Sequence, residues 1–163
     1  MSSMIQRIAL VWSMSGLVFA QSYSDDPRLK TLPTRVNVAL KRHPELQVYN
    51  STAPIIIMGD FDGDNKPDYV VRVFDNKDRK GLFFIVSTIK HEYIMGCGNN
   101  DDIMSDWSFD EWCLFRHWQP ILLGPNALAP QPKGDFLSLS WSGKGGGIIC
   151  WDKGKFVWHQ QGE

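Results

Sequence analysis

A chain of 163 residues with a formal net charge of −1 fits a single domain. The near balance of basic and acidic residues argues against a general nucleic-acid or anionic-membrane partner, because both partners require a basic surface. A chain of this length buries a substantial core without needing disulfides.

Residues 1–20 have the composition of a cleaved export signal. Arg7 is their only charged residue, and a largely apolar run of thirteen uncharged residues follows it. Val18 and Ala20 are the small residues that a signal peptidase requires before a cut at Gln21. A membrane anchor is the alternative, but thirteen helical residues span only ~20 Å of a bilayer core of ~30 Å. We therefore expect a secreted or periplasmic protein with no membrane span after cleavage.

The expected mature domain, residues 21–163, keeps three cysteines. An exported protein folds in an oxidising compartment, where disulfides form. Cys97 lies between two glycines in a turn-like stretch, Cys113 lies sixteen positions later, and Cys150 lies in an apolar, strand-like stretch. We expect a disulfide between Cys97 and Cys113; three reduced, buried thiols are the alternative.

The beginning of the mature chain predicts an extended lead-in and one helix. Residues 21–33 are polar and contain two prolines, which favours an extended segment. Residues 34–43 place Val36 and Leu40 on one face at helical spacing, and Thr34 is a candidate cap for the start. A proline directly after this stretch ends the predicted helix.

Apolar, β-branched and aromatic runs separated by turn residues make up most of the remaining chain and predict antiparallel strands. These runs are residues 53–59, 68–75, 80–89, 118–124, 135–141, 147–152 and 155–160. Gly154 supplies the positive φ for a tight turn before the last run, and Ser108 with Glu111 predicts a short capped helix. We expect one α+β domain, mainly antiparallel sheet with one N-terminal helix.

The loop between the first two predicted strands carries carboxylates at alternating positions. A hard cation such as Ca²⁺ prefers six to eight oxygen ligands at about 2.3–2.6 Å, and alternate residues supply them because the intervening side chains point away. The expected ligands are the side chains of Asp60, Asp62, Asp64 and Asp68 and the backbone carbonyl of Lys66. Asn65 tolerates the sharp turn inside the loop. The alternative is a solvated acidic turn in which the aspartates act as turn formers.

The stretch "GDFDGDNKPDYVV", residues 59–71, resembles the calcium-binding loops of FG-GAP repeats, which occur in integrin-like propellers and in many exported bacterial proteins. The resemblance implies calcium ligation by the five residues just named. It does not imply a propeller, because a propeller would need the motif repeated. The loop differs from an EF-hand, since Val71 in a predicted strand replaces the bidentate Glu at the end of the EF-hand loop. The C-terminal "CWDKGKFVWHQQGE" also looks like the closing strands of small exported bacterial proteins with one such loop, a resemblance that brings no known activity.

Two other features permit weaker hypotheses. A second acidic stretch could form another cation site or a solvated surface loop; its members are Asp101, Asp102, Asp106, Asp110 and Glu111. Tryptophans concentrate in the same part of the chain, and we expect most of them in the core, with one or two available for a recognition surface. They are Trp107, Trp112, Trp118, Trp141, Trp151 and Trp158.

No recognisable catalytic motif accompanies the acidic loop. The stretch "HEYIM" has Met95 where a zinc-protease helix has its second histidine, and no G-x-S-x-G occurs. We expect a calcium-stabilised exported protein with a non-catalytic role, which binds or inhibits another exported macromolecule as an immunity protein does. The alternatives are a hydrolytic enzyme with structural calcium and a carbohydrate-binding module that uses exposed tryptophans. The expected partner is an exported protein or a glycan, not a nucleic acid.

Overall fold

The computed structural model describes residues 27–51, 53–87, 92–99, 109, 111–115, 133–142 and 145–161. The chain divides into two units, Met1–Thr31 and Leu32–Glu163. The described part of the first unit holds the short helix α1 (Pro27–Lys30), where the sequence predicts an extended segment. Proline suits the first position of a helix, because its missing N–H has no helical acceptor there. The predicted export signal, residues 1–20, lies outside the described residues.

The second unit begins with helix α2 (Thr34–Arg42), which confirms the predicted helix. Val36 and Ala39 are fully buried on its inner face. The predicted cap is wrong, because Pro33 occupies the N-cap position and no side chain caps the helix. Neither described helix is long and apolar enough to cross a membrane.

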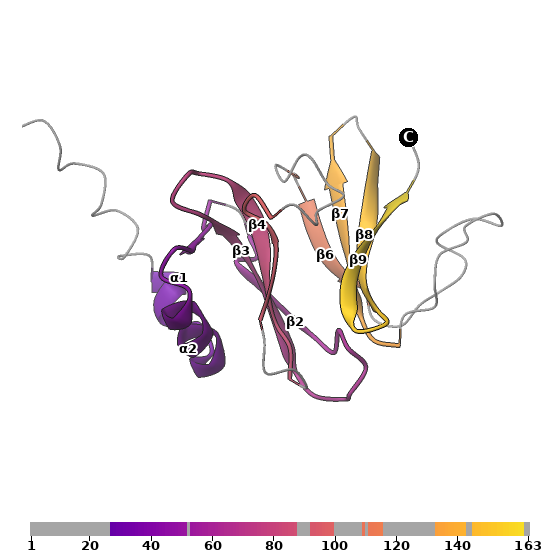
Figure 1. Ribbon diagram of the computed structural model, residues 1–163, viewed down its shortest axis with the longest axis horizontal. Helices are drawn as coiled ribbons and strands as arrows, with labels where there is room; N and C mark the ends of the chain where they lie inside the picture. Colours follow the sequence, from indigo (N-terminus) through magenta and orange to yellow (C-terminus); the bar gives the residue numbers. More distant parts are fainter. Residues whose placement is uncertain are drawn as a thin grey trace, which may run out of the picture. The chain divides into compact units, whose positions relative to one another are not determined.

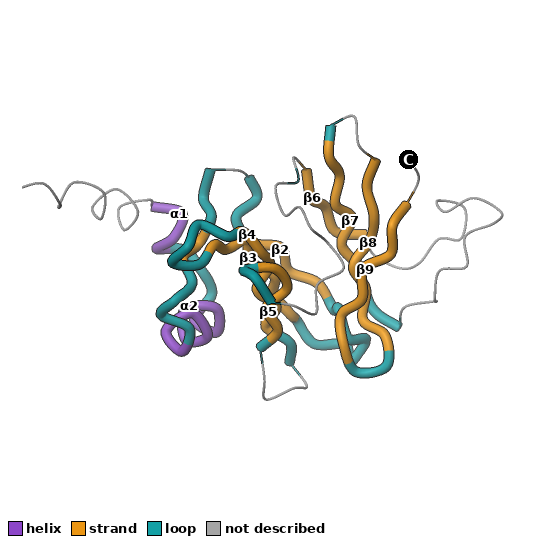
Figure 2. The backbone as a smooth tube through the Cα atoms, turned by 45° about the horizontal axis from the view of Figure 1, so that its top comes forward, coloured by secondary structure: helices purple, strands orange, loops and turns teal. Residues whose placement is uncertain are grey.

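The first sheet contains five antiparallel strands. β3 (Asp68–Phe74) pairs with β4 (Lys80–Ile85), which pairs with β5 (Tyr93–Gly96). The other edge of β3 pairs with both β1 (Gln47–Val48) and β2 (Ile56–Gly59). Figure 2 labels β2, β3, β4 and β5 of this sheet, which lie close together in that view.

Both faces of the central strands β3 and β4 are buried, which explains why these two strands are almost continuously apolar, apart from Arg72, rather than alternating. Val71 and Phe83 pair across β3 and β4 and are fully buried on one face. The ring of His43, which directly follows α2, lies 5.0 Å from the ring of Phe83 on this face. Val70 and Phe84 pair on the opposite face and belong to the main hydrophobic cluster.

The second sheet is an antiparallel meander in the order β6-β7-β8-β9 (Figure 1). Its strands are β6 (Glu111–Phe115), β7 (Phe136–Trp141), β8 (Gly145–Asp152) and β9 (Lys155–Gln161). Gly154 has a φ of 89° in the turn between β8 and β9, as predicted. The helix predicted from Ser108 and Glu111 is wrong where it is described, because Glu111 begins β6. Burial alternates along β6, where Trp112 is buried between the exposed Glu111 and Cys113, because one face of the strand packs on the core.

The two sheets pack through one hydrophobic cluster. The rings of Phe84 in β4 and Phe156 in β9 are stacked with their centroids 3.9 Å apart. Other members come from both sheets: Ile57, Val70 and Leu82 from the first, with Val86 just after β4, and Leu137, Leu139, Ile149 and Trp158 from the second. The α+β prediction is therefore wrong: the described chain is mainly β, with two antiparallel sheets and two short helices. Strand patterns show which face of a strand is apolar, but they do not show which strands share a sheet.

The cysteines also differ from the prediction, since no disulfide joins Cys97 to Cys113 or to Cys150. Cys97 is buried in the turn after β5 in the first sheet. Cys113 is exposed on β6 in the second sheet, on the side away from its core neighbour Trp112. The two thiols therefore belong to different sheets and face different surroundings, which the sixteen-residue spacing could not reveal.

Candidate metal centre

The acidic loop connects β2 to β3, and the pairing of Gly59 with Asp68 closes its base. Gly63 and Asn65 have φ values of 74° and 63°, so the chain turns sharply twice inside the loop. Glycine and asparagine are the residues that adopt this left-handed region most readily. Phe61 points the other way and is 1% exposed in the hydrophobic core. Burial of its ring therefore anchors the loop to the space between the sheets.

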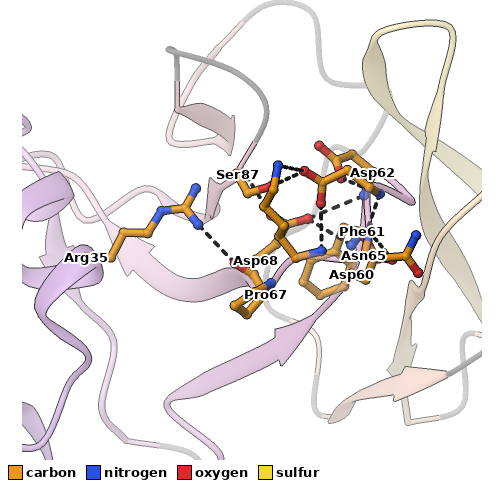
Figure 3. Close-up of polar contacts among 10 residues, drawn as sticks. Arg35, Asp60, Phe61, Asp62, Asn65, Pro67, Asp68 and Ser87 are labelled. Carbon is orange, nitrogen blue, oxygen red and sulfur yellow. Dashed lines mark hydrogen bonds and ion pairs between the residues drawn. The ribbon is translucent and has the colours of Figure 1, made fainter.

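Backbone N–H groups turn the first two carboxylates inward (Figure 3). Asp60 accepts hydrogen bonds from the backbone N–H of Asp64 at 2.9 Å and of Asn65 at 3.0 Å. Asp62 accepts a longer bond of 3.2 Å from the N–H of Asp64. These local bonds are typical of aspartates that shape turns, and they bring the carboxylates of Asp60 and Asp62 to the same side of the loop.

Asp68 is the buried member of the group, with 0% of its surface exposed. One of its oxygens accepts the N–H of Phe61 at 2.9 Å, and the other accepts the N–H of Ser87 at 2.7 Å. The pKa of Asp68 is raised to about 6, mainly by burial and also by the negative charge of Asp62, while the backbone N–H donors act in the opposite direction. A carboxylate in such a position is stabilised in its charged form by a nearby cation.

Asp60, Asp62 and Asp68 lie close enough together to hold a metal ion. Each offers a carboxylate oxygen, and the three oxygens all lie within 4.8 Å of one another. Two oxygens bound to one Ca²⁺ ion at about 2.3–2.6 Å are separated by at most about 5 Å, so this spacing is compatible with shared coordination. The chain thus brings together three of the predicted side-chain ligands.

Asp64, the fourth predicted side-chain ligand, lies outside this group and has other partners. The Ser87 hydroxyl donates to it at 2.5 Å, and both the backbone N–H and the ammonium group of Lys66 donate to it, at 2.8 and 3.0 Å. These bonds, with the Ser87 hydroxyl first, lower the pKa of Asp64 to about 2. The proposed role of the Lys66 carbonyl as a ligand stays a prediction.

Three residues from outside the loop hold it in place, and the sequence did not indicate any of them. Ser87, just beyond β4, bonds both Asp64 and Asp68. Arg35 of α2 donates to the backbone carbonyl of Pro67 at 2.9 Å, as Figure 3 shows. Asp135, immediately before β7, accepts the N–H of Asp60 at 2.9 Å. Because β3 pairs with β4, a residue just after β4 such as Ser87 is expected near the start of β3, where Asp68 lies. No local sequence pattern relates Asp135 to the acidic loop, which is 75 residues away in sequence.

The other candidate residues contribute no second site in the described part of the chain. Of the second acidic stretch, Asp101, Asp102, Asp106 and Asp110 lie outside the described residues, and Glu111 is exposed on β6. Four tryptophans are described, and all of them lie in the main hydrophobic cluster or pack against it: Trp112, Trp141, Trp151 and Trp158. Trp107 and Trp118 lie outside the described residues.

These features define a mainly β protein with three convergent carboxylates in one interstrand loop. Comparison of the chain with models of known protein families, with curated proteins and with solved structures gives no significant match. The function is therefore argued from the loop itself.

Proposed function

We propose that the β2–β3 loop binds a structural Ca²⁺ ion through Asp60, Asp62 and Asp68, in the manner of a single FG-GAP-like loop. The observation that carries this proposal is the convergence of three carboxylate oxygens within 4.8 Å. Without a cation the like charges repel one another and oppose the folded loop, whereas with a cation the same charges contribute binding energy.

The chemistry of the donors favours calcium over other common cations. All three groups are carboxylates, and hard cations such as Ca²⁺ prefer oxygen ligands, whereas Zn²⁺ is held mostly by histidine and cysteine. Mg²⁺ requires near-ideal octahedral geometry and retains several waters, so it gains less from an irregular loop. Backbone carbonyls of the loop, including that of Lys66, are the proposed source of further ligands.

A structural role follows from what the loop connects. Asp68 is the first residue of β3, the central strand of the first sheet, and Ser87 ties the same carboxylate to the end of β4. Binding to the folded state alone would contribute about 2.7 kcal/mol when free Ca²⁺ is 100 times its Kd. At ~2–4 °C per kcal/mol for a chain of this size, the melting temperature would rise by roughly 5–11 °C.

Calorimetric titration of chelator-treated protein with Ca²⁺, paired with thermal melts, tests the proposal. We expect binding heat and a raised melting temperature for the wild type, and at least a tenfold loss of affinity in Asp62→Asn. Asp78→Asn is the matched control, because Asp78 is exposed in the β3–β4 turn at a φ of 58°, which asparagine also adopts. A wild type with no heat and an unchanged melt would refute the site.

For the domain as a whole, we propose a non-catalytic role in binding or inhibiting another exported macromolecule. Trp112 and Trp158 are buried, and Trp141 and Trp151 are partly buried against the same cluster, which favours a protein partner over glycan stacking. His43 is partly buried; its Nδ1 lies 3.0 Å from a Glu45 carboxylate oxygen and its Nε2 lies 3.8 Å from one of Glu92, and neither glutamate belongs to the acidic loop. A pull-down from the cell's exported fraction, with and without chelator, tests this role, and no specific partner in either arm would count against it.

A further inference from the structure

The acidic loop is joined to the second sheet by a two-bond bridge. The backbone N–H of Asp60 donates to the Asp135 carboxylate at 2.9 Å, and the backbone N–H of Asp135 donates to the Asp60 carbonyl at 2.7 Å. Asp60 directly follows β2 of the first sheet, and Asp135 directly precedes β7 of the second. The bridge therefore links a carboxylate of the candidate metal centre to the start of a strand in the other sheet.

Two glycines allow the backbones to approach closely at this bridge. A Cβ atom on Gly134 would lie 2.2 Å from the Asp60 carbonyl oxygen and 2.7 Å from the Gly63 nitrogen. A Cβ atom on Gly63 would in turn lie 2.9 Å from the backbone of Lys133. These are backbone atoms, which cannot rotate out of the way, so only glycine fits on either side. Residues 133–135 therefore pack directly against the backbone of the acidic loop.

The Asp135 carboxylate occupies a confined position. Asp135 is 8% exposed, and a Cβ atom on Gly59 would lie 3.0 Å from its oxygen. A buried carboxylate is costly unless it accepts hydrogen bonds, and a bond to a backbone N–H is among the stronger ones that it can accept. The Asp135 oxygens are not part of the three-carboxylate group, and Asp135 contacts the loop through its hydrogen bond with the Asp60 backbone N–H.

We propose that Asp135 is a positioning residue of the cation site, which orients Asp60 toward Asp62 and Asp68 and couples occupancy of the loop to the second sheet. This inference rests on the proposed calcium site. Residues that orient metal ligands are commonly worth about 10–100-fold in affinity, although they never touch the ion.

The coupling has an intrinsic spectroscopic reporter. The four described tryptophans lie one on each strand of the second sheet, while the loop belongs to the first. Calcium binding that reaches the second sheet through Asp135 should therefore change tryptophan emission, with the same midpoint as the calorimetric titration. Calcium binding without any effect on the second sheet would leave this emission unchanged. Because Phe61 of the loop packs in the same cluster as Trp112 and Trp158, loss of the emission change in an Asp135 variant is what assigns the coupling to Asp135.

The test compares Asp135→Ala and Asp135→Asn with the Asp78→Asn control, by calcium calorimetry and tryptophan emission. We expect Asp135→Ala to weaken calcium binding about 10–100-fold and to abolish the emission change. Asp135→Asn should restore most of the affinity, because the amide oxygen still accepts the Asp60 N–H. Asp78→Asn should behave as the wild type.

Several outcomes would overturn the inference. Unchanged calcium binding by Asp135→Ala would remove the positioning role while leaving the proposed site intact. Equal losses in Asp135→Asn and Asp135→Ala would show that the Asp135 charge itself is required, as for a direct ligand. If Asp135→Ala does not fold, the wild-type emission decides: calcium heat without an emission change would refute the coupling. A wild type without calcium heat would remove the proposed site and this inference together.

Discussion

Asp68 should act both as a metal ligand and as a scaffold for the loop, and Asp68→Asn separates the two contributions. Each oxygen of the buried carboxylate accepts a backbone N–H, one from Phe61 and the other from Ser87. An asparagine has one oxygen and one NH₂ group, so either orientation places a donor against a backbone donor. The substitution removes a buried charge but leaves one buried N–H without its acceptor.

An unsatisfied buried donor costs about 1–3 kcal/mol, but the substitution also removes a charge that burial disfavours, so we expect Asp68→Asn to lose at most about 3 kcal/mol in chelator. With calcium at 100 times the wild-type Kd, the wild type gains about 2.7 kcal/mol that the variant lacks. The difference in free energy of unfolding should therefore be about 2.7 kcal/mol larger in calcium than in chelator. Asp62 is only half-buried, and in chelator Asp62→Asn should stay within about 0.5 kcal/mol of the wild type.

Urea unfolding followed by circular dichroism, in chelator and in excess calcium, measures these differences. Two results would contradict the reasoning. If Asp68→Asn lost clearly more than about 3 kcal/mol in chelator, a single unsatisfied backbone donor could not account for the loss. If calcium stabilised Asp68→Asn as much as the wild type, Asp68 would not be a ligand.

Two further predictions concern the hairpin between β3 and β4 and the cysteines. Burial disfavours the charged form of Asp75, but hydrogen bonds from Arg79 and Lys77 outweigh it and lower the pKa of Asp75 to about 2. Because the folded pKa lies below the ordinary 3.8, the charged form of Asp75 stabilises the fold above pH ~4, and this stabilisation is lost as the pH falls toward 2. In urea unfolding, Asp75→Asn should therefore cost about 1 kcal/mol at pH 7 and little at pH 2. The same cost at both pH values would contradict this prediction. Cys113 is exposed while the other two cysteines are buried, so a thiol reagent should label one cysteine rapidly in the native protein and three after unfolding. A reductant should leave the melting temperature unchanged. Slow labelling of all three cysteines in the native protein would contradict this prediction.

The sequence predicted six of the nine described strands because their local patterns are strong, but it did not predict β1, β5 or β6. The predicted strand at residues 118–124 lies outside the described residues. The β-branched run at Asp68–Phe74 and the aromatic run at Lys80–Ile85 are bounded by turn residues, and both are strands. The division into two sheets could not be predicted, because it depends on which apolar faces meet, as Phe84 and Phe156 do. At Glu111 a local capping pattern favoured a helix, but pairing with β7 and burial of Trp112 outweighed it.

The candidate site was predictable in part for a related reason. Alternate spacing placed Asp60 and Asp62 on one side of the loop and Phe61 on the other, and the structure has this arrangement. Spacing alone also made Asp64 a ligand, but its side chain is directed to Ser87, which lies 23 residues away in sequence. Side-chain direction in a loop depends on such partners, and a single sequence does not reveal them.

The partners of the acidic loop come from widely separated parts of the chain, and this has a kinetic consequence. Arg35 lies 32 residues before the Pro67 carbonyl that it binds, and Asp135 lies 75 residues after Asp60. Contacts of such sequence separation close late, because long stretches of chain must first be ordered. A cation held there would act on an already assembled molecule, and it would prolong the lifetime of the native state rather than hasten its formation.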